Sequence, residues 1–439
     1  MVRSAPNGVI HVKKNRHQTQ DILRKITSLE NLAEACKKVV KNDGGPGIDG
    51  MTVDDLKRWF ANNWQTLQKA MLNGTYKPKP TKGIKIPKPK GGERLLGIPT
   101  VIDRLVQQAI AQILQTIYDP TFSKHSYGFR PKRNAHHALL QATKCVCEGK
   151  SKVIDLDLEN FFGEVNHQRL LATLRTRIGD KRLIWILNLT LKTGILLDGV
   201  LGQQGKGTPQ GSPLSPLLSN IVLDELDQEL QRRGLSFSRY ADDIQIFVKS
   251  QVSSERVFGG IINFIEKKMR LKVNKRKSSV SKPWEVNFLG HNILSGGRVG
   301  LSKDSEAKLK WKLREITKRK REAPIKSILQ QIGTTLTGWM QYFKYASMKS
   351  KLTAIDGWLR RRIRCIKLRQ CKRCFTVVKF LRQLNVEETL AWRTALSGKS
   401  RWRISKSPAL SIGMSVKWFL QQGYYNILEN YSKLHSNPL

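Results

Sequence analysis

The sequence predicts an α+β protein in two parts: a domain with an antiparallel sheet and helices, then a second domain that is almost entirely helical. Up to about residue 295, short runs with alternating apolar residues are interspersed with longer runs of helical period. Beyond about residue 300 the strand pattern disappears, and Lys and Arg far outnumber Asp and Glu. The chain of 439 residues also exceeds one ordinary core, which favours two or three domains.

Helical signals come from periodicity and from capping residues. Residues 20–75 follow a helical pattern that the glycine-rich turn 42–50 interrupts. Thr100 and Asp103 form a capping pair that opens a strongly apolar helix. The tight loop 207–213 leads into another helix, and a loop at a helix N-terminus can present backbone N–H groups to a substrate.

Residues 76–99 predict a basic hairpin. Lysines and prolines alternate there, the prolines keep the chain extended, and Gly91-Gly92 is typical of a turn. A hairpin of this kind suits contact with phosphate groups. Lysines along a sheet edge also serve simply to prevent aggregation, and this alternative stays open.

Two adjacent carboxylates, Asp242 and Asp243, stand at the expected tip of a hairpin, directly before the alternating strand 244–248. A second expected strand, 151–158, carries Asp155 and Asp157 on one face. Mg²⁺ takes oxygen ligands and usually keeps only one or two protein carboxylates, and polymerases use two such ions. An ordinary polar turn would also contain Asp, and the strand period alone leaves Asp155 and Asp157 equally able to reach a metal.

The charge of the chain indicates a polyanionic partner. Lys and Arg number 78 against 34 Asp and Glu, which gives a net charge of +44. Neutralising phosphates with such residues releases counterions and gives strong, salt-dependent binding to nucleic acid. An anionic membrane surface is the alternative, but no apolar run reaches the length of about 18 residues that spans a bilayer. Residues 1–20 also lack the apolar segment of a signal peptide, so we expect a cytoplasmic protein.

The most basic stretch runs from Arg360 to Arg373 without an acidic residue. Leu359, Ile363 and Ile366 form one apolar stripe of a helix, and the cations occupy the rest. Clustered cations repel one another unless an anion neutralises them, although a solvated face is also possible. We expect nucleic-acid contacts from Arg360, Arg361, Arg362, Arg364, Lys367 and Arg369.

The cysteines predict neither a disulfide framework nor a metal site. The six cysteines lack the paired spacing of a secreted protein. Cys371 and Cys374 form a C-x-x-C pair, but no second pair or nearby histidine completes a tetrahedral zinc site. Free thiols are expected.

Several long motifs, in this order, resemble the reverse transcriptases encoded by bacterial group II introns, the intron-encoded maturases. They cover nearly the whole chain: 41–52, 86–100, Ser126-Tyr127-Gly128-Phe129-Arg130-Pro131, Thr208-Pro209-Gln210-Gly211 and Phe288-Leu289-Gly290. Gly338-Trp339 with Tyr342-Phe343 resembles the signature of the thumb-like maturase domain X.

The resemblance implies a right-hand polymerase, in which fingers and a palm with an antiparallel sheet are followed by an α-helical thumb. The implied domains are an N-terminal helical extension (1–75), fingers and palm (76–295), thumb or domain X (296–395) and a short DNA-binding-like tail (396–439). Arg401-Trp402-Arg403 is the expected contact of that tail. Nothing near the C-terminus offers paired metal-ligand motifs, so the resemblance is to members without an endonuclease module.

The resemblance also assigns the metal site. The family places its catalytic aspartate five residues before an aromatic gate, and Asp157 and Phe162 have that spacing. Asp157 therefore joins Asp242 and Asp243 as the implied catalytic triad, and Asp155 becomes structural. The implied ligands of two Mg²⁺ ions are these three carboxylates and the backbone carbonyl of Leu158.

The implied nucleotide contacts come from separate segments. Lys88, Arg94, Gln210 and Lys277 would contact the incoming deoxynucleotide, and the ring of Phe162 would exclude ribonucleotides by clashing with the 2′-hydroxyl. Gly163 departs from the family, which commonly has Asp there, and we expect a glycine to loosen the gate.

The implied function is RNA-directed DNA synthesis, together with binding of the intron RNA as a maturase that promotes splicing and retrohoming. The implied partners are the intron RNA, an RNA template with a DNA primer, target DNA and dNTPs. Two other functions stay open: an RNA-folding cofactor that has lost polymerisation, and a reverse transcriptase domesticated for defence or repair.

Overall fold

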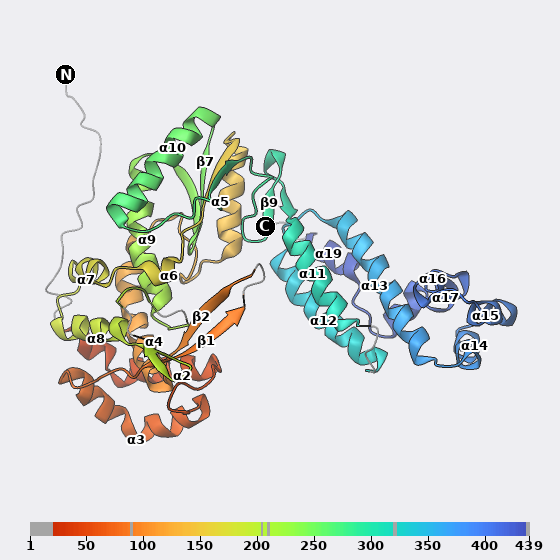
Figure 1. Cartoon of the computed structure of the whole chain (residues 1–439), viewed down its shortest axis with the longest axis horizontal. Helices are drawn as coiled ribbons and strands as arrows, with labels where there is room; N and C mark the ends of the chain where they lie inside the picture. The colour runs from red at the N-terminus through yellow and green to blue at the C-terminus, as the bar shows by residue number, and fades with distance from the viewer. Residues whose placement is uncertain (1–20, 88–90, 203–204, 209–210, 319–322, 436–439) are drawn as a thin grey trace. The chain divides into compact units, whose positions relative to one another are not determined.

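The computed structural model describes residues 21–87, 91–202, 205–208, 211–318 and 323–435. The chain divides into two compact units, Met1–Ser281 and Lys282–Leu439, which are described separately. Figure 1 traces both along the chain. Within the described ranges, no helix is both long and apolar enough to cross a membrane.

The first unit opens with three helices, as the periodicity of residues 20–75 predicts. These are α1 (Ile22–Ile26), α2 (Leu29–Lys41) and α3 (Val53–Leu72). Ser28 caps α2, and Thr52 forms a capping box with Asp55 at the start of α3. The predicted interruption at 42–50 separates α2 from α3.

The predicted basic hairpin is also present. Strands β1 (Thr81–Pro87) and β2 (Glu93–Ile98) pair antiparallel, and Gly91 and Gly92 between them have φ of +91° and +80°. Two short strands, β4 (Ile195–Leu197) and β5 (Val200–Gly202), extend this sheet in the order β2-β1-β4-β5. The sequence reading missed these two strands, because three residues are too few to show an alternating pattern.

Helix α4 (Val101–Tyr118) is the core of the first unit and confirms the capped helix predicted from residue 100. The hydroxyl of Thr100 accepts from the amide of Asp103, and Leu105 and Ile110 are fully buried. The other side of Asp103 is also occupied, since the hydroxyl of Tyr76 donates to its carboxylate at 2.5 Å. This contact ties α4 to the segment that leads into β1.

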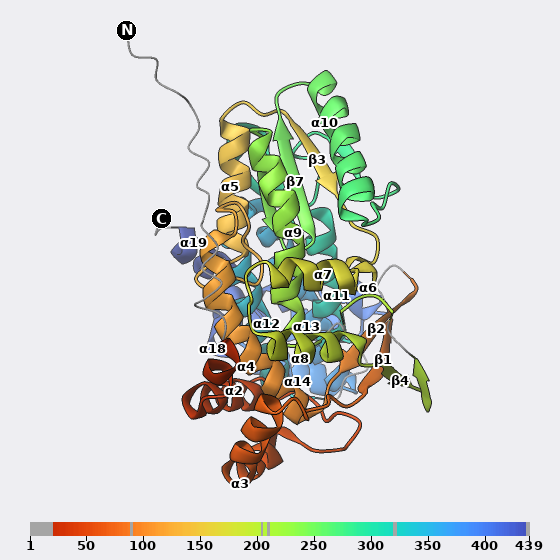
Figure 2. The same ribbon diagram turned by 90° about the vertical axis from the view of Figure 1, so that its left-hand side faces the viewer.

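A second, fully antiparallel sheet carries the acidic motifs. Its strands are β6 (Ser236–Tyr240), β7 (Asp243–Val248), β3 (Lys152–Leu156) and β8 (Ser279–Ser281), in that order. Helices α5 (Ala135–Cys147) and α9 (Ser215–Arg232) pack on β6, and α10 (Gln251–Asn263) packs on β3 and β8. Figure 2 shows α5 on the β7 side and α10 on the β3 side of this sheet.

Between β3 and β4 lie three helices, α6 (Phe161–Glu164), α7 (His167–Arg175) and α8 (Lys181–Lys192). Helix α10 continues as a π-helical turn, Phe264–Met269, which ends at Arg270 with φ of +56°. A short 3₁₀ turn, Asp119–Thr121, follows α4.

The second unit is helical apart from one small hairpin, β9 (His291–Ile293) and β10 (Val299–Leu301), as the loss of strand pattern after residue 300 predicts. Its helices are α11 (Lys303–Ile316), α12 (Ile325–Tyr342), α13 (Lys349–Gln370), α14 (Cys374–Gln383), α15 (Glu388–Ala395), α16 (Arg401–Ile404), α17 (Pro408–Gly413), α18 (Val416–Gln421) and α19 (Ile427–His435). Helix α13 is central, because α12, α16 and α19 all pack against it.

The buried stripe of α4 gives a test of the first unit. We expect Leu105→Ala to lower the free energy of unfolding by about 2–5 kcal/mol, because it leaves a cavity where no solvent reaches. Leu140→Ala on α5, where Leu140 is 39% exposed, is the matched control and should change it by less than about 1 kcal/mol. Urea denaturation of both variants checks this, and equal effects would contradict the assignment of α4 as the core helix.

Candidate functional site

The structure confirms the hairpin tip that carries the adjacent acids. Tyr240 pairs with Asp243 across β6 and β7, so Ala241 and Asp242 form a two-residue turn. Ala241 has φ of +58°, a conformation that strains an L-residue and needs support from its surroundings. Leu156, the last residue of β3, pairs with Ile244, so that Asp157, which follows it, and Asp243, which precedes Ile244, come at the same end of the sheet.

Four carboxylates therefore gather at this end of the sheet. Burial and repulsion from three neighbouring carboxylates raise the pKa of Asp243 to about 7, although solvent still reaches its side chain at the turn. Those neighbours are Asp242, Asp155 and Asp157. Asp243 is surrounded by protein atoms and like charges without being fully enclosed, which explains why its pKa is raised although solvent reaches its side chain.

Asp155 is the member of this group that the strand period left undecided. It lies opposite Gln245 and accepts a hydrogen bond of 3.3 Å from the side-chain amide of that residue. Burial, with the Asp157 charge as a further cause, raises the pKa of Asp155 to about 6. Asp155 thus lies further from the turn than Asp157, and Gln245 on β7 holds its carboxylate.

The turn that leads into β8 positions Asp157. Its amide donates to the hydroxyl of Ser278 at 3.0 Å, and its carbonyl accepts from the amide of Asn274 at 2.8 Å. The ammonium of Lys277 lies 3.3 Å from one carboxylate oxygen of Asp157. The structure therefore brings the predicted phosphate contact Lys277 directly to the predicted metal ligand Asp157.

Leu158, whose carbonyl was the fourth expected ligand, lies opposite Val273 in an isolated β-bridge. The two hydrogen bonds of this bridge use the carbonyls of Asp157 and Lys272. Neither of them therefore occupies the carbonyl of Leu158.

The expected aromatic gate, Phe162, is the second residue of α6 and lies beside the loop that precedes α9. Its carbonyl accepts from the amide of Thr208 at 2.7 Å, and Gly207 donates to the carbonyl of Val165 at 2.8 Å. Gly207 has φ of +89°, and a Cβ there would lie 2.8 Å from the Phe162 carbonyl oxygen. The gate and this loop are therefore joined through their backbones.

Gly163 is also accommodated locally. A Cβ at Gly163 would lie 2.3 Å from the side-chain amide nitrogen of Asn160, which itself has φ of +46°. A larger residue there would require Asn160 to move. The backbone hydrogen bond to Thr208 holds Phe162 on its other side.

Of the remaining expected nucleotide contacts, the structure describes Arg94 alone. Arg94 is exposed on β2, opposite Ile86. Lys88 and Gln210 lie outside the described residues. Gly211 follows directly, and a Cβ on it would lie 2.7 Å from the carbonyl oxygen of Gly97, so the loop passes against β2.

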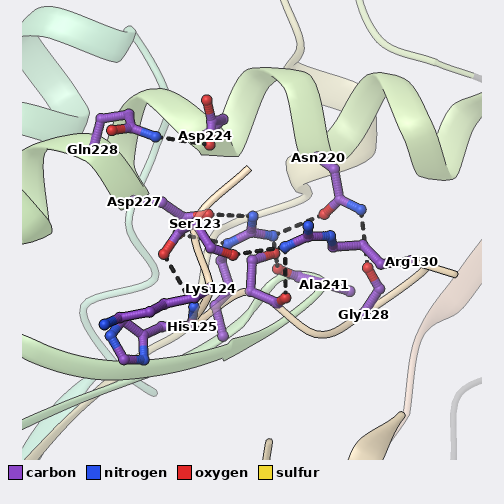
Figure 3. A network of polar contacts seen from close by, with 12 residues as sticks. Ser123, Lys124, His125, Gly128, Arg130, Asn220, Asp224, Asp227, Gln228 and Ala241 are labelled. Carbon is purple, nitrogen blue, oxygen red and sulfur yellow. Dashed lines mark hydrogen bonds and ion pairs between the residues drawn. The ribbon is translucent and has the colours of Figure 1, made fainter. Parts of the chain in front are cut away.

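A buried ion pair supports the acidic turn. Arg239 on β6 is fully buried, and its guanidinium donates to both carboxylate oxygens of Asp227 on α9, at 2.8 and 2.5 Å. Its remaining contacts are the side-chain oxygen of Asn220 at 2.9 Å and the carbonyl of Ala241 at 3.0 Å. Figure 3 shows Asp227, Asn220 and Ala241 gathered around this network. The pair therefore fixes the strained backbone from which Asp242 projects.

The motif 126–131 supports the same turn from another side. Ser126 bridges Arg239 in parallel, and Asn220 donates to the carbonyl of Gly128 at 2.9 Å. A Cβ on Gly128 would lie 2.3 Å from the backbone nitrogen of Ala241, so only glycine permits this approach. The sequence marked this motif through the family resemblance but did not indicate its packing role.

In the second unit, the structure corrects the expectation for the basic helix. Arg364 is 9% exposed and donates to the carbonyls of Ser405 and Met414. Arg362 donates to the hydroxyl of Thr317 at 2.5 Å and to its carbonyl at 2.8 Å. These two arginines hold α13 against its neighbours. The prediction that Arg364 contacts RNA is wrong, because its side chain is buried and bonded within the protein.

The other cations of α13 are also partly engaged. Arg360 forms an ion pair with Asp356 at 2.7 Å, and the Arg361 guanidinium lies 3.8 Å from the ring centre of Trp402. The Lys367 ammonium lies 4.5 Å from the ring centre of Phe380. Of the six residues, Arg369 alone is classed as exposed. The helical period could not show this, because distant helices cover α13.

A different basic surface emerges instead around α15 to α17. A hollow of about 380 Å³ there is lined by Arg393, Lys399, Arg403 and Lys406, together with the hydroxyls of Thr394, Ser397 and Ser407. Of these cations the sequence reading singled out Arg403 alone. Arg393 lies on α15 and Arg403 on α16, while Lys399 and Lys406 lie in the segments after these helices, so no local pattern groups the four.

The acidic end of the sheet suits a divalent cation without enclosing one. Among the described residues, no three His, Cys, Asp or Glu side chains are grouped closely enough to hold an ion on their own. Mg²⁺ usually keeps several waters or substrate oxygens, so an open set of carboxylates fits it. The neighbouring carboxylates raise the pKa of Asp243, and the ammonium of Lys277 lies beside Asp157. Both observations indicate that a cation would be stabilised at this end of the sheet.

An antiparallel sheet with acids on adjacent strand ends, followed by a helical domain, is compatible with a nucleic-acid polymerase, and two family models identify the class. Residues 86–293 match the family model described as reverse transcriptase (RNA-dependent DNA polymerase), and residues 307–383 match that of the group II intron maturase-specific domain. The chain belongs to the family of reverse transcriptases encoded by group II introns, with its maturase domain.

Curated relatives agree with this assignment. The chain is 34% identical over 319 residues to Protein YkfC of Escherichia coli strain K12, covering 63% of this chain and 83% of that protein. It is 34% identical over 196 residues to the group II intron-encoded protein LtrA of Lactococcus lactis, covering 44% of this chain and 33% of LtrA. The chain thus spans about a third of LtrA's length.

A more distant relative and a solved structure also match. The retron Ec86 reverse transcriptase of Escherichia coli is 26% identical over 210 residues, covering 46% of this chain and 60% of that protein. Among solved structures, a partial Cas6-RT-Cas1–Cas2 complex matches with a TM-score of 0.37 and 25% identity, covering 57% of this chain and 43% of that chain.

The buried pair makes a prediction for stability. We expect Arg239→Met to lower the free energy of unfolding of the first unit by about 3–5 kcal/mol, because it leaves the Asp227 carboxylate buried without its partner. Arg239→Met combined with Asp227→Leu should recover most of that loss, since it removes both charges. Urea denaturation measures both, and a cost below about 1 kcal/mol for the single variant would contradict the role of the pair.

Proposed function

We propose that the chain synthesises DNA on an RNA template at the end of β3 and β7, with Asp157 and Asp242 as the ligands of two Mg²⁺ ions and Asp243 in support. The observation that carries this proposal is the convergence of these acids with Lys277 at one end of the sheet. The backbone carbonyl of Leu158 is the fourth proposed ligand.

The reaction forms one bond and breaks another. The 3′-hydroxyl oxygen of the primer attacks the α-phosphorus of a dNTP, the bond to pyrophosphate breaks, and the hydroxyl proton passes to water. When bound, Mg²⁺ stabilises the attacking and leaving oxygens. The protein's own contribution is positioning and charge, which is what phosphoryl transfer requires.

Three basic side chains and one amide, from separate segments of the chain, would bind the triphosphate. We assign this role to Arg94 and Lys88 on the β1–β2 hairpin, to Gln210 in the loop before α9, and to Lys277. Lys277 balances the charge of Asp157 in the structure, and a bound cation at Asp157 would release its ammonium toward phosphate oxygens. The ring of Phe162 would lie against the sugar and exclude a 2′-hydroxyl.

The maturase function requires a surface for the intron RNA, and recognition of folded RNA depends largely on backbone and shape. We propose the hollow around α15 to α17, together with the exposed Arg369, as a phosphate-binding part of that surface. We propose that target DNA contacts the same region, because it includes part of the DNA-binding-like tail that the sequence predicts over residues 396–439.

The metal ligands are tested by primer extension. We expect Asp242→Ala, alone or with Asp243→Ala, to reduce cDNA synthesis on an RNA template with Mg²⁺ by more than about a hundredfold, because charge stabilisation of the transition state is lost. Asp54→Ala, an exposed acid on α3, is the control and should keep full activity. An active double variant would reject the assignment, and an inactive unmodified protein that still binds RNA would favour a pure RNA-folding cofactor.

The basic hollow is tested by the salt dependence of binding. Changing Arg393, Lys399, Arg403 and Lys406 together to Ala should flatten the plot of log affinity for intron RNA against log salt by roughly 0.7–0.9 per lost phosphate contact. Four exposed cations on and beside α10 and its π turn, Lys249, Arg256, Lys267 and Lys268, serve as the charge-matched control. An equal flattening in both variants would show only a general charge effect and would refute the hollow as a site.

A further inference from the structure

A second hollow lies in the first unit, where α7 ends and α8 begins. It has a volume of about 600 Å³ and is lined by Arg175, Ile178, Gly179, Lys181, Ile184, Trp185 and Asn188. This volume falls within the range of small-molecule sites. None of these residues belongs to the acidic site or to the basic hollow of the second unit.

Trp185 is the unusual feature of this hollow. Its side chain is 51% exposed, while its neighbours Ile178 and Ile184 are 3% and 6% exposed and form the floor. An indole ring held open above an apolar floor offers a flat face for another ring.

Two cations beside the Trp185 ring, Arg175 and Lys181, are accessible to a ligand. Arg175 and Lys181 are exposed, and neither has an ion pair or hydrogen bond from its side chain to any described residue. The acid between them in sequence, Asp180, is 3% exposed and is occupied by the amide of Leu23 and the guanidinium of Arg182. The hollow therefore presents two cations that no neighbouring carboxylate neutralises.

We propose that this hollow binds one unpaired nucleotide of single-stranded RNA. The base would stack on Trp185, the flanking phosphates would contact Arg175 and Lys181, and the amide of Asn188 would reach the base edge. Stacking on an aromatic side chain beside a cationic track is the general mode of binding to single strands. The proposal depends on the proposed function only in taking RNA as the nucleic acid.

Other occupants fit less well. Asp21, the first described residue, forms an ion pair with Arg182 at 2.8 Å, and the sequence before it contains Arg3, Lys13, Lys14 and Arg16 and no acid. Such a segment would add positive charge to a hollow that is already cationic. A duplex would hide its base faces by stacking, so the exposed ring favours an unpaired base.

Binding measurements separate the two parts of the proposal. With the full chain, a fluorescent 12-nucleotide uridine-rich RNA and no dNTPs, Trp185→Ala should weaken binding about fivefold or more with an unchanged salt slope. Trp185→Phe should recover part of the affinity, because a smaller ring still stacks. Arg175→Ala with Lys181→Ala should flatten the salt slope by roughly 1.4, at about 0.7 per phosphate contact on a single strand.

The matched control is Lys249→Ala with Arg256→Ala, beside and on α10, which both views place well away from α8 (Figures 1 and 2). The proposal is overturned if Trp185→Ala binds as the unmodified protein does, or if the control flattens the slope equally. Equal losses for a blunt RNA hairpin would also overturn it, as would a larger loss for single-stranded DNA.

Direct contact is checked by photocrosslinking. RNA that carries 5-iodouridine should crosslink to the peptide that contains Trp185, and mass spectrometry identifies the site. RNA that crosslinks only to other peptides, with none at the peptide that contains Trp185, would reject the nucleotide at this hollow. Because neither measurement involves cDNA synthesis, failure here and failure of primer extension are distinguishable.

Discussion

The salt bridge between Arg239 and Asp227 is the contact on which the acidic turn, and with it the proposed polymerase site, depends most. Both side chains are fully buried, where an isolated charge is expensive, and each is balanced by the other. Because Arg239 also holds the carbonyl of Ala241, the folding of α9 against β6 and the conformation of the acidic turn are parts of one arrangement. A rigid support is needed here, since Ala241 adopts a strained backbone and Asp242 and Asp243 repel each other.

Opposing charges organise the site as well as its support. The acids at the ends of β3 and β7 repel one another, and that repulsion favours any cation that can approach. In the protein alone, Lys277 supplies part of this charge at Asp157. This charge distribution favours a cation, as the proposed Mg²⁺ site requires, and the open turn leaves room for the oxygens of the proposed substrate.

Local patterns predicted the elements that carry strong local signals. The capped helix from Val101, the hairpin around Gly91-Gly92 and the acidic turn all follow from short-range chemistry. Strands of three residues, such as β4 and β8, carry no usable period. The Arg239 network joins residues 12 and 19 positions apart and a loop still further away, so nothing in the local sequence marks it. The cations of α13 show the converse failure: their pattern is that of a solvated face, and only tertiary packing reveals that Arg361 lies on Trp402 of α16 and Lys367 on Phe380 of α14.

The hydrogen bond between Thr208 and the carbonyl of Phe162 has a consequence for selectivity. If the ring of Phe162 lies against the sugar and the loop lies beside the base, as proposed, this bond makes the two move together. Any movement of the loop on meeting a mispaired base would carry the ring with it, and a displaced sugar would push the loop in return. Discrimination against the wrong sugar and against the wrong base would then share a single coupling free energy, so that changes in this loop alter both kinds of error together.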